Sequence, residues 1–125
     1  MYVRITSIHC WPGQWPEYQA TAERLCLESR HLAPARLSVW MIRSTEDPDQ
    51  GVSLSLWTSQ EELEAYEAGD WYRKRLMPEL EKHLVGEIPV TRGELRFMYE
   101  SQKGWTFRRS RFDAGSEATS QSRNP

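Results

Sequence analysis

The sequence has few of the residues that usually identify a disulfide framework or a metal site. It holds two cysteines and three histidines in 125 residues. Cys10 and Cys26 lack the spacing of a disulfide framework or of a zinc motif. We therefore expect two reduced thiols, with a single Cys10–Cys26 bridge as the alternative. The histidines at positions 9, 31 and 83 form no ligand motif, so no metal is expected.

Several longer motifs are also missing. The chain contains neither a Gly-x-Gly-x-x-Gly element nor a Walker element, so a nucleotide cofactor has no support. It has no Gly-x-Ser-x-Gly element that would indicate a serine nucleophile. No apolar run approaches the length of a transmembrane helix, and the start MYVRITSIHC lacks the pattern of a signal peptide. These absences predict a cytoplasmic protein without a cofactor or a membrane partner.

Neither sign of charge is in large excess, but the charges are unevenly distributed. The chain has 16 basic and 18 acidic residues. Residues 101–125 hold five of the basic and two of the acidic ones, which leaves eleven basic and sixteen acidic residues in 1–100. The end of the chain, AGSEATSQSRNP, is small and polar, as is typical of disorder. We expect a folded acidic domain over 1–100 and a basic, partly disordered tail over 101–125.

The tail carries two large aromatic residues, Trp105 and Phe107. Its stretch KGWTFRRSRF mixes basic and aromatic residues, as binders of single-stranded nucleic acid do. One short basic segment next to an acidic domain is too little to indicate nucleic-acid binding, and we expect no nucleic-acid partner. We expect instead that the two aromatic residues dock on the domain or on a partner chain, or that the segment is simply solvated.

Hydrophobic periodicity predicts strands at 2–9, 36–43, 52–57 and about 93–99. A helix opened by Pro16 and ended by Ala33-Pro34 is expected between the first two strands. A second helix is expected after Ser59, which precedes Glu62 as in a capping box. Gly69-Asp70 interrupts that helix, with Asp70 able to cap a further segment that runs to about residue 84. Pro78 predicts a kink or a boundary within this segment.

This order, β-α-β-β-α-β, predicts a ferredoxin-like α+β fold with helices on one face of an antiparallel sheet. The third strand alternates strictly, so that Leu54 and Leu56 face away from Ser55 and Trp57. One face would then bear an apolar row without helices over it. A second sheet must cover such a row, which predicts a homodimer through the sheet faces.

Residues 57–66, WTSQEELEAY, contain the pattern W-x-S-x-E-x-L-x-A at the junction of strand and helix. Together with Glu28-Ser29-Arg30 at the end of the first helix and the order of elements, they resemble antibiotic biosynthesis monooxygenase domains. The resemblance covers about residues 1–100. It implies a dimeric α+β barrel in which two ferredoxin-like sheets meet face to face.

The resemblance also implies where chemistry would lie. In several members the tryptophan at Trp57 lines a cavity between sheet and helices. Members that oxidise aromatic polyketides without metal or flavin have an asparagine at the position of Ser53, and many members have a histidine at that of Tyr66. Haem-degrading relatives use an asparagine and a histidine where this chain has Ser7 and about Leu76, which disfavours haem degradation.

Trp57 above the small residues Ser53 and Ser55 is either a pocket wall for a flat substrate or a core residue. His9 is either a general base for a phenol or enol or a hydrogen-bonded histidine at a strand end. The aromatic residues around the helix starts frame a pocket mouth or pack the helix ends; they are Trp11, Trp15, Tyr18, Trp71 and Tyr72. The predicted catalytic residues are His9 and Tyr66. The predicted substrate-binding residues are Trp57, Ser53, Ser55, Ser7, Trp71 and Tyr72.

These features favour a cofactor-independent monooxygenase that acts on a small aromatic or polyketide-type substrate in a pocket between sheet and helices. In such a mechanism the substrate carbanion reacts directly with oxygen, and the protein supplies desolvation and orientation. The alternative is a non-catalytic or stress-related dimer that binds an apolar ligand in the same cavity.

Overall fold

The computed structural model describes residues 1–101, of which Met1–Leu95 form one compact unit. Arg96 to Glu100 begin a second unit and contain no helix or strand. The predictions made for Trp105, Phe107 and the end of the tail lie outside the described residues.

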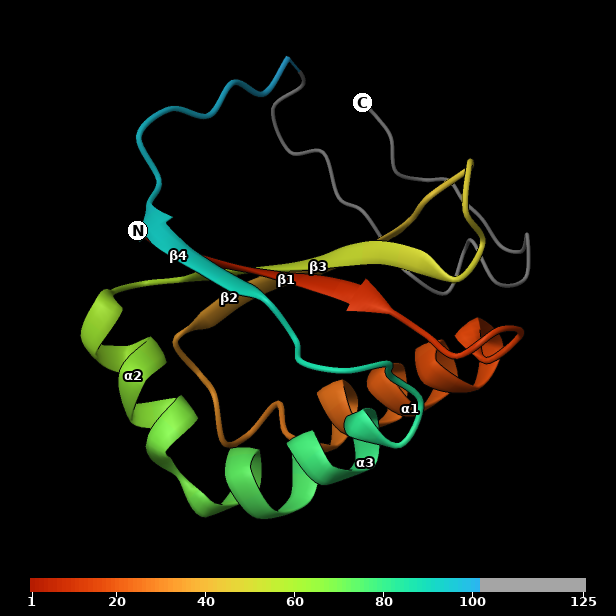
Figure 1. Ribbon diagram of the computed structural model, residues 1–125. Helices are drawn as coiled ribbons and strands as arrows, with labels where there is room; N and C mark the ends of the chain where they lie inside the picture. The colour runs from red at the N-terminus through yellow and green to blue at the C-terminus, as the bar shows by residue number, and fades with distance from the viewer. Residues whose placement is uncertain (102–125) are drawn as a thin grey trace. The chain divides into compact units, whose positions relative to one another are not determined.

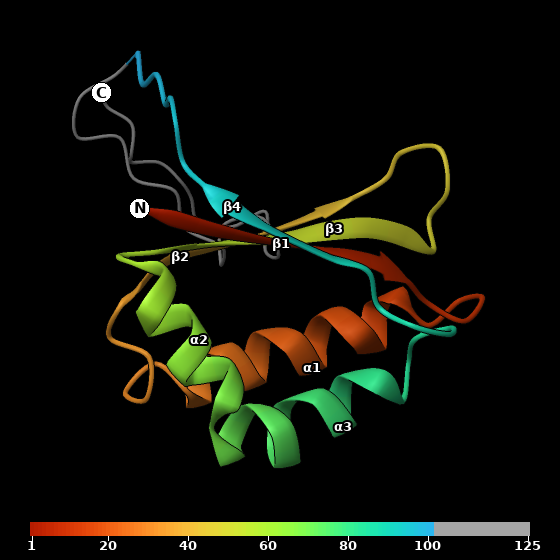
Figure 2. The same cartoon turned by 60° about the vertical axis from the view of Figure 1, so that its left-hand side comes forward.

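The compact unit is a four-stranded antiparallel sheet with helices on one face (Figures 1 and 2). The strands lie in the order β2-β3-β1-β4. The elements follow one another as β1 (Tyr2–His9), α1 (Trp15–Glu28), β2 (Arg36–Arg43), β3 (Gln50–Trp57), α2 (Gln60–Ala68), η1 (Trp71–Leu76), α3 (Met77–Glu81) and β4 (Val90–Glu94). This is the predicted ferredoxin-like arrangement, and the prediction is confirmed.

The helix starts follow the predicted signals. Pro16 lies in the first turn of α1, where its missing N–H costs nothing. The Ser59 hydroxyl accepts a hydrogen bond from the backbone N–H of Glu62 at 3.2 Å, so Ser59 caps α2 as predicted. The first helix is shorter than expected and ends at Glu28 rather than at Ala33. There the buried Ser29 hydroxyl donates to the carbonyl of Cys26 at 3.2 Å, and residues 29–33 turn toward β2.

The segment after Gly69 differs in detail from the prediction. It begins with one stretch of π-helix, η1, and continues as the short α-helix α3. The predicted boundary near Pro78 is confirmed, because proline cannot donate the backbone hydrogen bond that would continue a regular helix. The predicted cap at Asp70 is wrong. Asp70 is itself helical and makes no side-chain cap bond, and its carboxylate lies 3.6 Å from Lys74 Nζ instead.

The last strand lies earlier than predicted, at Val90–Glu94 rather than at about 93–99. The reason is the length of its partner. Strand β1 begins at Tyr2, which pairs with Glu94, and the Leu95 N–H makes one more bond to the carbonyl of Met1. The alternating residues Phe97 and Tyr99 therefore have no strand of the unit to pair with, and both are exposed.

The pairing register assigns every strand residue to one of two faces. On the face under the helices, Arg4 lies opposite Ser55 and Thr6 opposite Ser53. On the other face, Val3 lies opposite Leu56 and Ile5 opposite Leu54. We call these the covered face and the uncovered face. The predicted separation of the leucine row from the Ser53-Ser55-Trp57 row is confirmed, since Trp57 is buried on the covered side.

Two clusters form the core between the covered face and the helices. One contains Ile8, Cys10, Trp15, Tyr18 and Leu84, and the other contains Ala33, Trp57 and Leu63. Gly51 is part of the packing of the first cluster, because a Cβ at this position would lie 2.6 Å from the Trp15 ring. The space above the small residues of β3 is therefore occupied at this end of the strand by a helix side chain.

Candidate functional site

Trp57 is a core residue on the covered face. Its side chain is 2% exposed, and its indole N–H donates to the Ser55 hydroxyl at 2.9 Å. Its ring centroid lies 5.0 Å from that of Tyr66, which in turn lies 5.5 Å from that of Tyr72. Of the two interpretations from the sequence, this geometry is that of core packing, since the three rings fill the space between the end of β3 and the helices.

A polar network lies beside these rings. Arg4 on β1 donates through Nε to Glu67 at 2.6 Å, through Nη1 to Thr6 at 2.9 Å, and through Nη2 to the Tyr72 hydroxyl. Arg92 on β4 donates to the same Glu67 carboxylate at 3.0 Å. Burial raises the pKa of Tyr72, although the Arg4 guanidinium acts in the opposite sense. Tyr72 is therefore a neutral phenol near pH 7.

The network was not expected from the sequence, although its signal was present. Arg4 alternates in phase with Thr6 and Ile8, so it lies on the covered face of β1. A charged side chain on a covered face needs a partner, and Glu67 on α2 supplies it. Side chains of Arg4 and Glu67 are only 15% and 14% exposed.

The structure does not bring the two predicted catalytic residues together. Tyr66 lies under the sheet, against Trp57 and Tyr72, and its hydroxyl is 3.5 Å from Arg36 Nη1. His9 lies in the register of the uncovered face, opposite Gln50. Ser7 lies on that face too, opposite Val52, whereas Ser53 and Ser55 lie on the covered face. One small substrate cannot contact both groups of residues, because the sheet separates them.

His9 and Ser7 line a groove of about 450 Å³ at the end of β1. The uncovered face contributes Ser7, His9, Gln50 and Val52 to the lining, and Ser44 follows β2. The other wall is the segment Leu84–Pro89, which includes Glu87. This volume lies within the range of about 300–1,000 Å³ that is usual for small-molecule sites.

The backbone fixes the position of this second wall. The Val85 N–H donates to the carbonyl of His9 at 2.8 Å, and the Ser7 N–H donates to that of Pro89 at 3.0 Å. Between these two bonds the chain turns at Gly86, whose φ of 66° favours glycine. The groove is thus tied to β1 on both sides of the turn.

The groove contains the groups needed for proton transfer. His9 is an exposed imidazole, the side-chain type most suited to accept a proton near neutral pH. Glu87 brings a carboxylate to the same groove, and Ser7 and Ser44 bring hydroxyls. No sequence pattern indicated Glu87 or Ser44 as site residues, because both lie outside periodic segments.

The remaining aromatic residues do not share one pocket mouth. Trp15 and Tyr18 are buried in the first core cluster with ring centroids 5.7 Å apart, whereas Trp11 is 51% exposed. The Arg75 guanidinium lies over the Trp71 ring, with its Cζ atom 5.6 Å from the ring centroid. Among the described residues, its indole N–H is buried without a hydrogen-bond partner.

Both cysteines are free thiols. Cys10 is fully buried, and burial raises its pKa to about 11. No group of three or more His, Cys, Asp or Glu side chains among residues 1–101 could hold a metal ion. None of the helices in that part of the chain is long and apolar enough to cross a membrane.

The architecture is that of the antibiotic biosynthesis monooxygenase fold, a ferredoxin-like α+β fold. A crystal structure of an antibiotic biosynthesis monooxygenase superposes with a TM-score of 0.64 at 19% identity, over 77% of this chain and 99% of the other. A variant of SnoaB, a cofactor-independent oxygenase from Streptomyces nogalater, gives 0.66 at 10% identity over 78% and 94%. A conserved protein from Methanosarcina mazei Go1 gives 0.64 at 15% identity over 77% and 94%.

No protein-family model matches the sequence, and neither does any curated protein. Identities of 10–19% establish a common fold and leave the reaction open. The activity therefore has to be argued from the side chains of this chain.

Proposed function

We propose that the protein is a homodimeric monooxygenase that needs no cofactor and takes a small aromatic or polyketide-type substrate into the groove beside His9. The likeness to SnoaB, a cofactor-independent oxygenase, supports the class of reaction. The observation that carries the proposal is the position of His9, because an exposed imidazole shares a groove of ligand size with Glu87 and two serine hydroxyls.

In this proposal His9 accepts a proton from an acidic C–H group of a substrate such as an anthrone. The resulting carbanion reduces O₂ and forms a C–O bond with it. The peroxide anion that results takes the proton back from His9 and becomes a hydroperoxide. Loss of water then converts the CH–OOH group into a carbonyl. One oxygen atom enters the product, the other leaves as water, and the substrate supplies all the electrons. In the same proposal, the side chains of Ser7, Ser44 and Glu87 orient the substrate through hydrogen bonds.

The test is oxygen uptake with a panel of anthrones and quinols, by protein treated with a chelator. His9→Gln removes the base while keeping a polar side chain, and we expect it to lower kcat by about 100-fold or more. His31→Gln is the matched control, since His31 is exposed and lies outside the groove. Equal loss in both variants, or none in His9→Gln, would contradict the role of His9. Ligand binding by the wild type without oxygen uptake would favour the non-catalytic ligand-binding protein.

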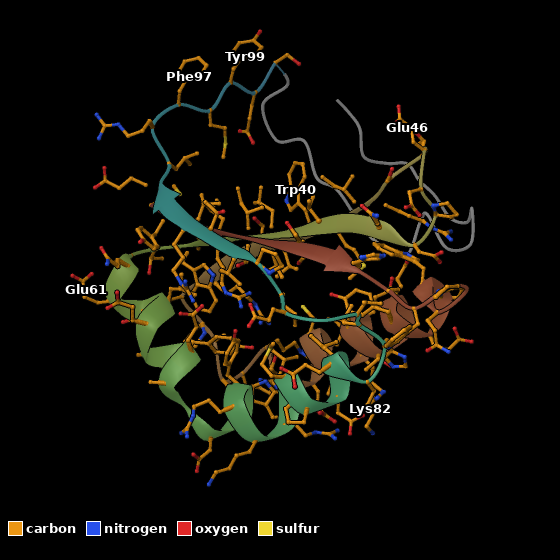
Figure 3. The ribbon with its side chains drawn as sticks, viewed as in Figure 1. Trp40, Glu46, Glu61, Lys82, Phe97 and Tyr99 are labelled. Carbon is orange, nitrogen blue, oxygen red and sulfur yellow. The ribbon has the colours of Figure 1, made fainter. Side chains whose placement is uncertain are left out.

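The proposed dimer forms through the uncovered face. Ile5, Trp40 and Ile42 on this face are 36%, 48% and 49% exposed in the single chain. Figure 3 shows the Trp40 side chain pointing away from the helices. Large apolar groups gathered on one face favour association. Sedimentation that shows only monomer at micromolar concentration would contradict this part of the proposal.

A further inference from the structure

The two faces of the sheet have opposite charge content. The covered face carries Arg4, Arg36, Arg43, Arg92 and Glu94 by register. At the paired strand positions of the uncovered face there is no Asp, Glu, Lys or Arg. If the uncovered face were in contact with water, charged side chains would be expected on it. Depletion of charge is characteristic of the centre of a protein interface.

The groove opens on this same face. Four of its lining residues, Ser7, His9, Gln50 and Val52, belong to the uncovered face by register. Ser7, His9 and Gln50 are exposed in the single chain, as is Glu87 on the opposite wall. A partner surface that covers this face as far as the ends of β1 and β3 therefore also covers these residues of the groove.

A second copy of the chain is the occupant that the charges favour. Two uncharged faces can meet about a two-fold axis without placing like charges opposite each other. Two twisted antiparallel sheets also have matching shapes and pack about 10 Å apart. A charged partner surface would instead lose hydration against Leu54 and Trp40 and would gain no ion pair there.

We propose that the groove is completed by the second copy, so that ligand binding and dimerisation depend on each other. This inference rests on the dimer of the proposed function and adds a property to it. A ligand that fills a groove closed by two copies contacts both of them. By linkage, each bound ligand must then strengthen the dimer by the same factor by which the dimer strengthens the binding of that ligand.

The test separates the dimer from the residues of the groove. Leu56→Lys places a charge on the uncovered face, outside the groove lining and four residues along β3 from Val52, the nearest groove residue of that strand. That separation is about 14 Å at about 3.4 Å per residue. Leu27→Lys is the matched control, because it adds the same charge at a leucine of α1 that is 50% exposed. The probe is 1,8-dihydroxyanthraquinone, a flat aromatic compound without an oxidisable CH₂ group.

We expect Leu56→Lys to be monomeric in sedimentation and to bind the probe at least tenfold more weakly than the wild type, with unchanged circular dichroism. Leu27→Lys should dimerise and bind like the wild type. Saturating probe should also lower the dimer dissociation constant of the wild type at least tenfold. The probe reports binding alone, so absence of oxygen uptake would count against the monooxygenase and leave this inference standing.

Three results would overturn the inference. A monomeric Leu56→Lys variant that binds the probe with unchanged affinity would show that one copy completes the groove. A dimer constant that does not respond to the probe would show that the two equilibria are independent. A wild type that is monomeric, while full-length protein with Trp105→Ala and Phe107→Ala self-associates, would assign the face to the tail of the same chain.

Discussion

The two faces of this sheet use polar and apolar residues in opposite ways. Under the helices, Arg4, Glu67 and Arg92 form a charged network among tyrosines. On the side without helices, Ile5, Leu54 and Trp40 form an uncharged apolar surface. The difference indicates two separate tasks for one sheet. Contacts of the covered face determine the stability of the chain, and the uncovered face is available for association and for the groove beside His9.

Two tryptophans, one on each face, give the strongest test of this division. Trp57→Ala removes a ring that is 2% exposed and should lower the free energy of unfolding by about 3–5 kcal/mol, because it leaves a cavity between β3 and α2. Trp40→Ala removes a ring that is 48% exposed. It should weaken the proposed dimer at least tenfold in sedimentation and lower the free energy of unfolding in urea far less than Trp57→Ala does. Similar unfolding losses in both variants would contradict the division.

The charged network provides a test of intermediate size. Glu67→Gln leaves Arg4 without the carboxylate that its Nε contacts, at a site where little water can replace it. We expect the free energy of unfolding in urea to fall by about 2 kcal/mol. This is less than the loss of about 3–5 kcal/mol for a broken, fully buried pair, because Arg92 is 41% exposed.

The control for this test is Glu64→Gln, which makes the same change at an exposed position of α2. It should stay within about 0.5 kcal/mol of the wild type. If Glu67→Gln were equally mild, the network would contribute nothing to the stability of the covered side.

Cys10 gives the smallest expected effect and tests burial on the covered side directly. Its thiol has a pKa raised to about 11 from 9.0, so the folded chain holds this proton longer than the unfolded chain. Its contribution to stability is therefore complete below about pH 9 and is lost as the pH rises to about 11. Cys10→Ala should flatten the fall in unfolding free energy over that range.

Thiol titration checks the same point without unfolding the protein. At pH 8 a thiol reagent should react readily with Cys26, which is only partly buried, and slowly with Cys10. Cys26→Ser should then show almost no rapid reaction. Two rapidly reacting thiols in the wild type would mean that the first core cluster opens easily.

Much of the fold follows from the sequence, because its signals are local. The alternation of β3 and the cap at Ser59 depend on neighbouring residues only, and both were predicted correctly. The end of β4 was not predicted correctly, because it depends on where β1 begins. The two strands pair between opposite ends of the compact unit, with Tyr2 opposite Glu94. Propensity within a segment carries no information about the length of its partner.

The candidate site was predictable only in part, for the same reason. Alternation placed His9 and Ser7 on one face, and the register confirms that placement. It also places Tyr66 and Trp57 on the other side, so the prediction of a single pocket combined residues that the sheet separates. Glu87 enters the groove only because two backbone bonds hold residues 84–89 along β1. No periodic pattern in the sequence predicts the position of such a segment.

That segment has a consequence for how selectivity could change. Its attachment to β1 uses the N–H of Val85 and the carbonyl of Pro89, and both are main-chain groups. Side chains at Val85, Glu87 and Ile88 can therefore be exchanged without removing either bond. In an evolving lineage, or in a directed library, this wall can vary in size and charge while the strand that carries His9 stays in place. The groove could acquire new ligands through substitutions that leave the sheet unaltered.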